Sequence, residues 1–191
     1  MKQLKMLVLC ALAGLALSGC AQSLGSHQPS LQAIEVIRTS AIPPIHVATF
    51  AVAPGHSDSM DKSVVIRSVN LSSPDNGSFA QYLQKTLETD LNAAGKLNPN
   101  SDFTLQGLLT ESDVDSGIGT GSASLGAEFS LQKAGKTVFD KKLRVDSKWD
   151  SSFIGAEAIP DAMNQYSSLY DKLAVKLLSD DEFKAALAAP H

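Results

Sequence analysis

The most reactive side chains of this 191-residue chain are two cysteine thiols, Cys10 and Cys20, and both lie within the first twenty residues. A thiolate is a strong nucleophile toward acyl and alkyl donors, and it is also a metal ligand. Because no cysteine follows Cys20, a disulfide framework and a cysteine-ligated zinc site are excluded from the rest of the chain. The chemistry open to these thiols therefore depends on the N-terminal segment around them.

That segment has the layout of a secretory signal. Lys2 and Lys5 give it a positive start, and residues 6–17 form an uncharged run of 12 residues. A membrane-spanning helix needs about 20 apolar residues, so this run is too short to cross a bilayer. The run ends in Leu17-Ser18-Gly19-Cys20, which resembles the lipobox of bacterial lipoproteins.

The resemblance implies that Cys20 is a lipidation site. In lipoproteins the cysteine sulfur is diacylated, the peptide is cut directly before the cysteine, and the new amino terminus is acylated with a fatty acid such as palmitate. Cleavage would then fall between Gly19 and Cys20, making residues 1–19 a signal peptide and leaving no free thiol. Such anchoring is effectively permanent. Ala21 stands where an inner-membrane retention signal would have Asp, which by analogy favours the outer membrane, with the domain on its periplasmic face.

The charge balance argues against a nucleic-acid partner. Lys and Arg total 16 against 20 Asp and Glu, and loss of Lys2 and Lys5 with the signal peptide would lower the net charge from −4 to −6. Proteins that bind nucleic acids normally present a basic surface to the phosphates. Hydrophobic residues make up 43% of the chain, which is sufficient for a folded core.

Gly117-Ile118-Gly119-Thr120-Gly121 is the string closest to a nucleotide-binding loop. A dinucleotide fingerprint places such glycines between a strand and a helix, whose N-terminus holds the pyrophosphate. Here an alternating, strand-like segment follows instead. The string is therefore predicted to be a connection between two strands.

Glu111, Asp113 and Asp115 alternate just before this loop and would place three carboxylates on one face of a strand. Counted as an EF-hand from Asp113, the loop has Ile118 where glycine is required and Ser124 where a bidentate Glu belongs. We interpret the three carboxylates as a solvated strand end, with a weak Ca²⁺ site as the alternative.

The four histidines, His27, His46, His56 and His191, lack the spacing of metal ligands. The Gly-x-Ser-x-Gly elbow of hydrolases is also absent from the sequence. We therefore predict that the chain is not an enzyme, with no catalytic residues, metal site or cofactor. A hydrolase assembled from a distant serine, His46 or His56, and an aspartate remains the rival hypothesis.

The N-terminal half of the mature chain predicts few regular elements. Residues 20–43 are expected to be the lipidated cysteine and a tether, within which residues 31–37 fit either an edge strand or a short helix. Strands are predicted over 45–53, 64–71 and 103–109 from β-branched content and flanking turn residues.

Helical and alternating patterns are stronger in the C-terminal half. A helix is predicted over 78–94, closed by Gly95, and a second one from Ile159 with a short terminal helix after Ser179. Residues 123–149 predict a β-hairpin, because apolar and polar residues alternate on both sides of a short turn. Three tyrosines of the helices are expected in the core with solvated hydroxyls, namely Tyr82, Tyr166 and Tyr170.

These elements predict a single α+β domain over residues 44–188. We expect one antiparallel or mixed sheet of four to six strands, with two main helices packed on one face. The lipobox, the helix ending at Gly95, the hairpin 123–149 and the C-terminal segment around Asp180 and Phe183 together resemble the small YajG-type outer-membrane lipoproteins. More distantly they resemble the auxiliary lipoproteins of envelope transport systems.

The resemblance implies no catalytic residues. It favours a membrane-anchored, non-catalytic periplasmic module that binds another envelope component, either a protein or a lipid. A role as accessory lipoprotein of a lipid-transport system is a narrower alternative, and it would require an apolar groove or an exposed apolar patch.

Overall fold

The structure, a computed structural model, describes residues 21–188. Its helices are α2 (Leu31–Thr39), α3 (Phe79–Ala93), α4 (Gly155–Ser179), α5 (Asp181–Ala188) and the 3₁₀ helix η2 (Asp58–Asp61). The short strands are β1 (Ala21–Ser23), β2 (His46–Val47), β3 (Ala51–Val52), β4 (Val64–Ile66) and β5 (Val69–Ser72). The long strands are β6 (Phe103–Asp115), β7 (Gly119–Lys133) and β8 (Lys136–Ser151).

The strands form two mixed sheets, so the predicted α+β class is confirmed and the predicted single sheet is wrong. In the larger sheet β6, β7 and β8 are antiparallel neighbours, and β2 and β3 both run parallel to β6. The smaller sheet has the order β1-β5-β4. It arises because Arg67 adopts a left-handed conformation, with φ 54°, and turns the expected strand 64–71 into a hairpin.

The hairpin predicted over 123–149 is confirmed and is the longest part of the larger sheet. Leu125 faces Val145, and Leu131 faces Phe139 across the β7–β8 pair. The turn between the strands has positive φ at Ala134 (48°) and Gly135 (82°), which suits the right-handed twist of the flanking strands.

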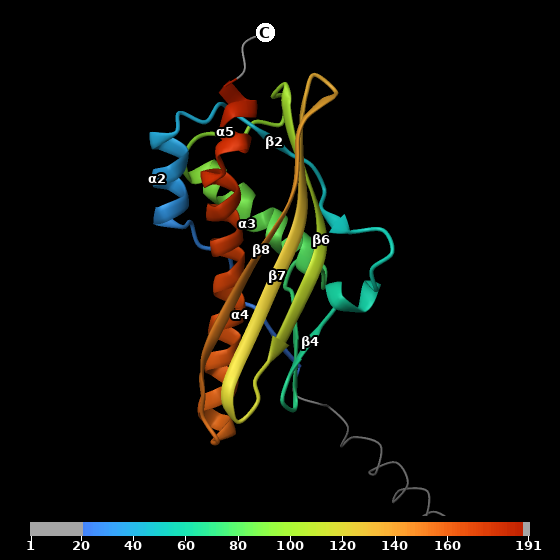
Figure 1. The fold of residues 1–191 in the computed structure, drawn as a ribbon, viewed down its shortest axis with the longest axis vertical. Coiled ribbons are helices and arrows are strands. Elements are labelled where there is room, and N and C mark those ends of the chain that lie inside the picture. The colour runs from blue at the N-terminus through green and yellow to red at the C-terminus, as the bar shows by residue number, and fades with distance from the viewer. Residues whose placement is uncertain (1–20, 189–191) are drawn as a thin grey trace, which may run out of the picture.

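The helices cover one side of the larger sheet (Figure 1). α3 ends beside Gly95, whose φ of 71° confirms the predicted C-terminal glycine. α4 packs on β7 and β8 and begins at Gly155, earlier than predicted, so that Pro160 lies inside the helix. With α2 and the predicted terminal helix α5 also contributing buried residues, the core involves more than the two main helices expected.

The segment expected to be a tether is folded onto the domain. β1 begins at Ala21, and α2 occupies the stretch that the sequence left open between strand and helix. Ser30 caps α2, and Ala33 and Ile37 are fully buried against the core. The folded unit described by the structure therefore starts at Ala21 and not near residue 44.

Candidate functional site

The predicted lipidation and cleavage residues, Cys20 and Gly19, lie outside the described residues. The next residue in the sequence, Ala21, pairs with Asn70 as the first residue of β1. Among residues 21–188, no helix combines the length and the apolar character needed to cross a bilayer.

The glycine string 117–121 joins β6 to β7, as predicted. No helix follows it, because Gly119 already begins β7. Gly121 lies opposite Trp149 on β8, and a Cβ at this glycine would overlap the indole ring. The glycine therefore makes room for a packed tryptophan and does not cradle a phosphate.

Glu111, the first of the three acidic residues before this string, forms an ion pair with Arg144. Both carboxylate oxygens of Glu111 accept hydrogen bonds from Arg144, from Nε at 2.7 Å and Nη2 at 3.1 Å. Ser124 donates to the same carboxylate at 2.6 Å. The bonds from Arg144 and Ser124 hold the pKa of Glu111 below its usual value despite partial burial. Across residues 21–188, no group of three His, Cys, Asp or Glu side chains is arranged to hold a metal ion.

The histidine with the most developed surroundings is His27, which the sequence placed in the tether. Its Nε2 lies 2.7 Å from Asp75 Oδ2, its Nδ1 lies 3.3 Å from Thr86 Oγ1, and its ring packs 4.1 Å from that of Tyr82. His27, Tyr82 and Thr86 border a cavity of about 290 Å³ that also reaches Ser168 and Asp171. The rival hydrolase hypothesis named His46 and His56, but His46 lies in β2 and His56 is exposed.

This arrangement contains a histidine, a carboxylate and a hydroxyl, but the hydroxyl is buried and directed to a backbone carbonyl. Thr86 is buried, and its Oγ1 donates its single proton to the Tyr82 carbonyl at 3.0 Å. Thr86 can therefore only accept a hydrogen bond from His27. A general base must instead receive the proton of the nucleophile.

Two further hydrogen bonds join the N-terminal segment to α3. Tyr82 Oη donates to the Gly25 carbonyl at 3.1 Å, and burial raises the pKa of Tyr82 to about 12, which keeps the hydroxyl protonated as a donor. The backbone N–H of Ser30 donates to Asp90 Oδ1 at 2.8 Å. No local pattern reveals this cluster, although Ser30 before the apolar Ala33 is a recognisable helix-capping signal.

Asp90 is the most deeply buried acidic residue of this region. Its Oδ1 accepts from Ser30, whereas Oδ2 has no partner in the part of the chain that the structure describes. Burial raises the pKa of Asp90 to about 6, although the Ser30 hydrogen bond opposes the rise. The carboxylate thus holds α2 in place at an electrostatic cost.

The tyrosine prediction was half correct. Tyr166 and Tyr170 are core residues, but their hydroxyls are buried and not solvated. Tyr166 Oη lies 2.7 Å from Ser112 Oγ and 2.9 Å from Tyr170 Oη, so a small hydrogen-bonded network replaces water. Sequence periodicity can place a tyrosine in a core but cannot show that Ser112, on a distant strand, will meet it.

Three connections meet at one end of the domain around Arg67. Its guanidinium donates to the carbonyls of Ser116 (3.1 Å), Ser152 and Phe153 (3.2 Å). This ties the β4–β5 turn to the β6–β7 and β8–α4 connections, which lie together at the lower end of the molecule in Figure 1. Ile118 and Phe153 point into solvent there, with 71% and 78% of their surfaces exposed.

No family model matches the sequence, and no curated protein matches it. Among solved structures, protein XCC0632 from Xanthomonas campestris, of the family DUF330, is 13% identical over 86% of this chain and 95% of its own, with a TM-score of 0.60. A putative lipoprotein from Caulobacter crescentus is 15% identical over 58% and 84% of the two chains, with a TM-score of 0.44. A minor lipoprotein from Acinetobacter baumannii is 9% identical over 73% and 94%, with a TM-score of 0.39. This chain therefore shares the fold of the Xanthomonas protein.

Proposed function

We propose that this chain is a lipoprotein anchored through Cys20 to the outer membrane, where its periplasmic domain binds another envelope protein without catalysing a reaction. The observation that carries the proposal is the junction at residues 20–21. A lipobox-like sequence ends at Cys20, and the next residue already belongs to a strand of the folded domain. An acyl-modified cysteine would hold this domain directly at a membrane surface and raise its effective concentration toward neighbours there.

The chemistry of the described side chains favours binding over hydrolysis. In the His27 cluster the imidazole pairs with Asp75. The neighbouring Thr86 hydroxyl donates its hydrogen bond to the Tyr82 carbonyl within α3 and not to His27. The cluster instead joins the N-terminal segment to the helix, which is a structural task.

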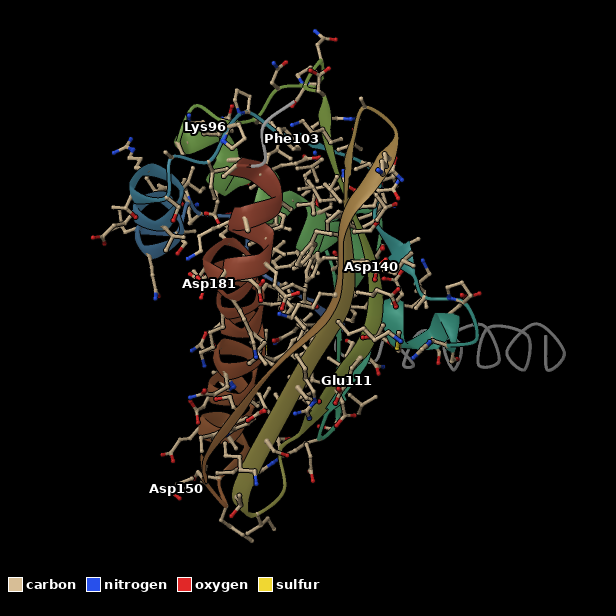
Figure 2. The ribbon with its side chains drawn as sticks, turned by 45° about the horizontal axis from the view of Figure 1, so that its top comes forward. Lys96, Phe103, Glu111, Asp140, Asp150 and Asp181 are labelled. Carbon is tan, nitrogen blue, oxygen red and sulfur yellow. The ribbon has the colours of Figure 1, made fainter. Side chains whose placement is uncertain are left out.

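The surface that fits a protein partner is the face of the larger sheet turned away from the helices. Figure 2 shows Glu111 and Asp140 on this side, with Asp181 on the helical side. The face carries both charge signs, including the Lys142–Glu128 pair at 3.4 Å and the Glu111–Arg144 pair. A groove of about 430 Å³ runs across it.

The composition of this groove bears on the lipid-transport alternative. Its lining includes Glu111, Asp113, Arg144, Asp146 and Lys148, together with serines. Charged walls suit polar contacts with a protein and oppose the burial of an acyl chain. The groove therefore supports a protein partner in preference to a lipid cargo.

Anchoring is tested by Cys20→Ser followed by membrane fractionation. The protein with Cys20 intact should pellet with outer membranes and resist high-salt washing. The C20S variant should leave the pellet. A variant that still pellets after the wash would show that a lipid on this cysteine is not the anchor.

Partner binding is tested by photocrosslinking in cells from two exposed lysine positions. A photoreactive amino acid at Lys142 probes the outer sheet face, and the same residue at Lys172, on the outer side of α4, serves as the control. We expect reproducible crosslinks to an envelope protein from position 142 only. Equal patterns from both positions would contradict the assignment of the partner to the sheet.

A further inference from the structure

Exposed apolar side chains gather at one end of the domain. Ile118, Phe153 and Ile154 extend from the β6–β7 and β8–α4 connections with 71%, 78% and 55% of their surfaces exposed, and Val65 of β4 follows with 58%. We propose that these four residues, here called the apolar tip, insert into the phospholipid surface of the membrane that holds Cys20. This inference rests on the proposed lipidation of Cys20.

The backbone of the apolar tip is held in place while its side chains point outward. Arg67 donates to the Ser116 and Phe153 carbonyls, and the Ser152 hydroxyl accepts from the Ile154 N–H at 3.1 Å. Asp115 accepts from the Gly117 N–H at 3.0 Å. A surface that enters a bilayer must satisfy its backbone polar groups internally, and these contacts meet part of that requirement.

Strand direction places the anchor at the same end. β1 runs parallel to β5, and β5 leads away from the Arg67 turn, so the chain enters β1 from the side of that turn. Ala21, Asn70 and Val65 form one row across the small sheet. At about 4.8 Å between strands, Ala21 lies about 10 Å from Val65. A lipid on the residue before Ala21 would bring the bilayer to the apolar tip.

The charges around the apolar tip indicate what drives the contact. Asp115 and Asp150 are exposed next to it, and Figure 2 shows Asp150 at the lower end of the molecule, opposite Phe103. The Arg67 guanidinium also lies at this end, but it donates to the carbonyls of the two connections. The exposed acidic neighbours do not attract anionic headgroups, so burial of apolar surface must supply the affinity. We therefore expect insertion into phosphatidylethanolamine-rich bilayers, without a requirement for phosphatidylglycerol.

The test places a spin label at Phe153→Cys in the full-length, lipidated protein. With Cys20 acylated and Cys10 removed with the signal peptide, the new cysteine is the single free thiol of the mature chain. The matched control is Leu31→Cys on α2, where another exposed apolar residue is replaced far from the apolar tip. Both proteins are reconstituted into phosphatidylethanolamine vesicles, with and without phosphatidylglycerol, and recovered by flotation.

For the label at 153 we expect a severalfold higher ratio of collisions with oxygen to collisions with a water-soluble nickel chelate than for the label at 31. Equal ratios in floated vesicles would overturn the insertion of the apolar tip while leaving the Cys20 anchor intact. A label at 153 that is protected from the nickel chelate in native membranes but not in lipid vesicles would indicate that the apolar tip contacts a protein. That result would also overturn the inference. Failure of both proteins to float would overturn the anchor and the insertion together.

Discussion

The buried carboxyl of Asp90 makes the stability of this fold dependent on pH. Asp90 has no exposed surface, and its carboxyl accepts a hydrogen bond from the backbone N–H of Ser30. Burial raises the pKa of Asp90 from 3.8 to about 6. The substitution Asp90→Asn retains an oxygen that can accept from Ser30 but removes the titration. Comparison of the D90N variant with the unmodified protein therefore isolates the cost of ionising this side chain.

The magnitude follows from the difference between the folded and unfolded pKa. A shift of about two units corresponds to about 3 kcal/mol. Because the folded pKa is raised, the folded protein binds a proton that the unfolded chain does not bind between about pH 4 and about pH 6. The free energy of unfolding therefore falls as the pH rises through this window. The full cost is present above about pH 6, and it is absent below about pH 4.

Urea denaturation at several pH values measures this effect. We expect the unmodified protein to gain about 3 kcal/mol relative to D90N as the pH falls from about 7 to about 4. Subtracting the two curves removes the contributions of the other titrating groups. Asp140→Asn, which removes an exposed carboxyl from β8, provides the matched control. A D90N difference that stays constant over the whole range would refute the reasoning.

Three further substitutions test the packing around the larger sheet and the Arg67 turn. Gly107→Ala would place a Cβ against the buried Phe50 ring, and it should lower the free energy of unfolding by about 1–3 kcal/mol in urea titrations. Tyr166→Phe leaves the Ser112 hydroxyl without this partner and should cost about 1–3 kcal/mol in the same assay, whereas an unchanged midpoint would show that the network contributes nothing. Arg67→Met removes the hydrogen bonds to the carbonyls of the β8–α4 connection. Chymotrypsin should therefore cleave after the exposed Phe153 faster in this variant than in the wild-type protein. Equal cleavage rates would contradict the role of the guanidinium.

Elements defined by local pattern were predictable from the sequence. The β7–β8 hairpin follows from alternation around a glycine turn, and α3 follows from apolar residues one helical turn apart ahead of Gly95. The short terminal helix after Ser179 was also predicted, and Asp180 caps it by accepting from the Glu182 and Phe183 N–H groups. In each case the residues that determine the element lie within it or directly beside it.

Elements that depend on distant partners were not predictable. The strand expected over 64–71 is broken because Arg67 bonds to carbonyls at 116, 152 and 153. The strand expected over 45–53 is divided into β2 and β3, and between them the Phe50 N–H donates to Gln84 on α3. His27 looked like a tether residue because its partners, Asp75 and Thr86, are 48 and 59 positions away.

The pairing of β1 with β5 limits how far the domain can extend from a membrane. Had residues 20–43 formed a free tether, that segment could have reached about 80 Å when extended. Instead Ala21 is already paired with Asn70, and α2 is packed on the core, so this length of chain is unavailable as a spacer. A lipid on Cys20 would confine the domain to a layer no thicker than its own longest dimension. A partner must then come within that layer, whether it is embedded in the same membrane or extends toward it from elsewhere.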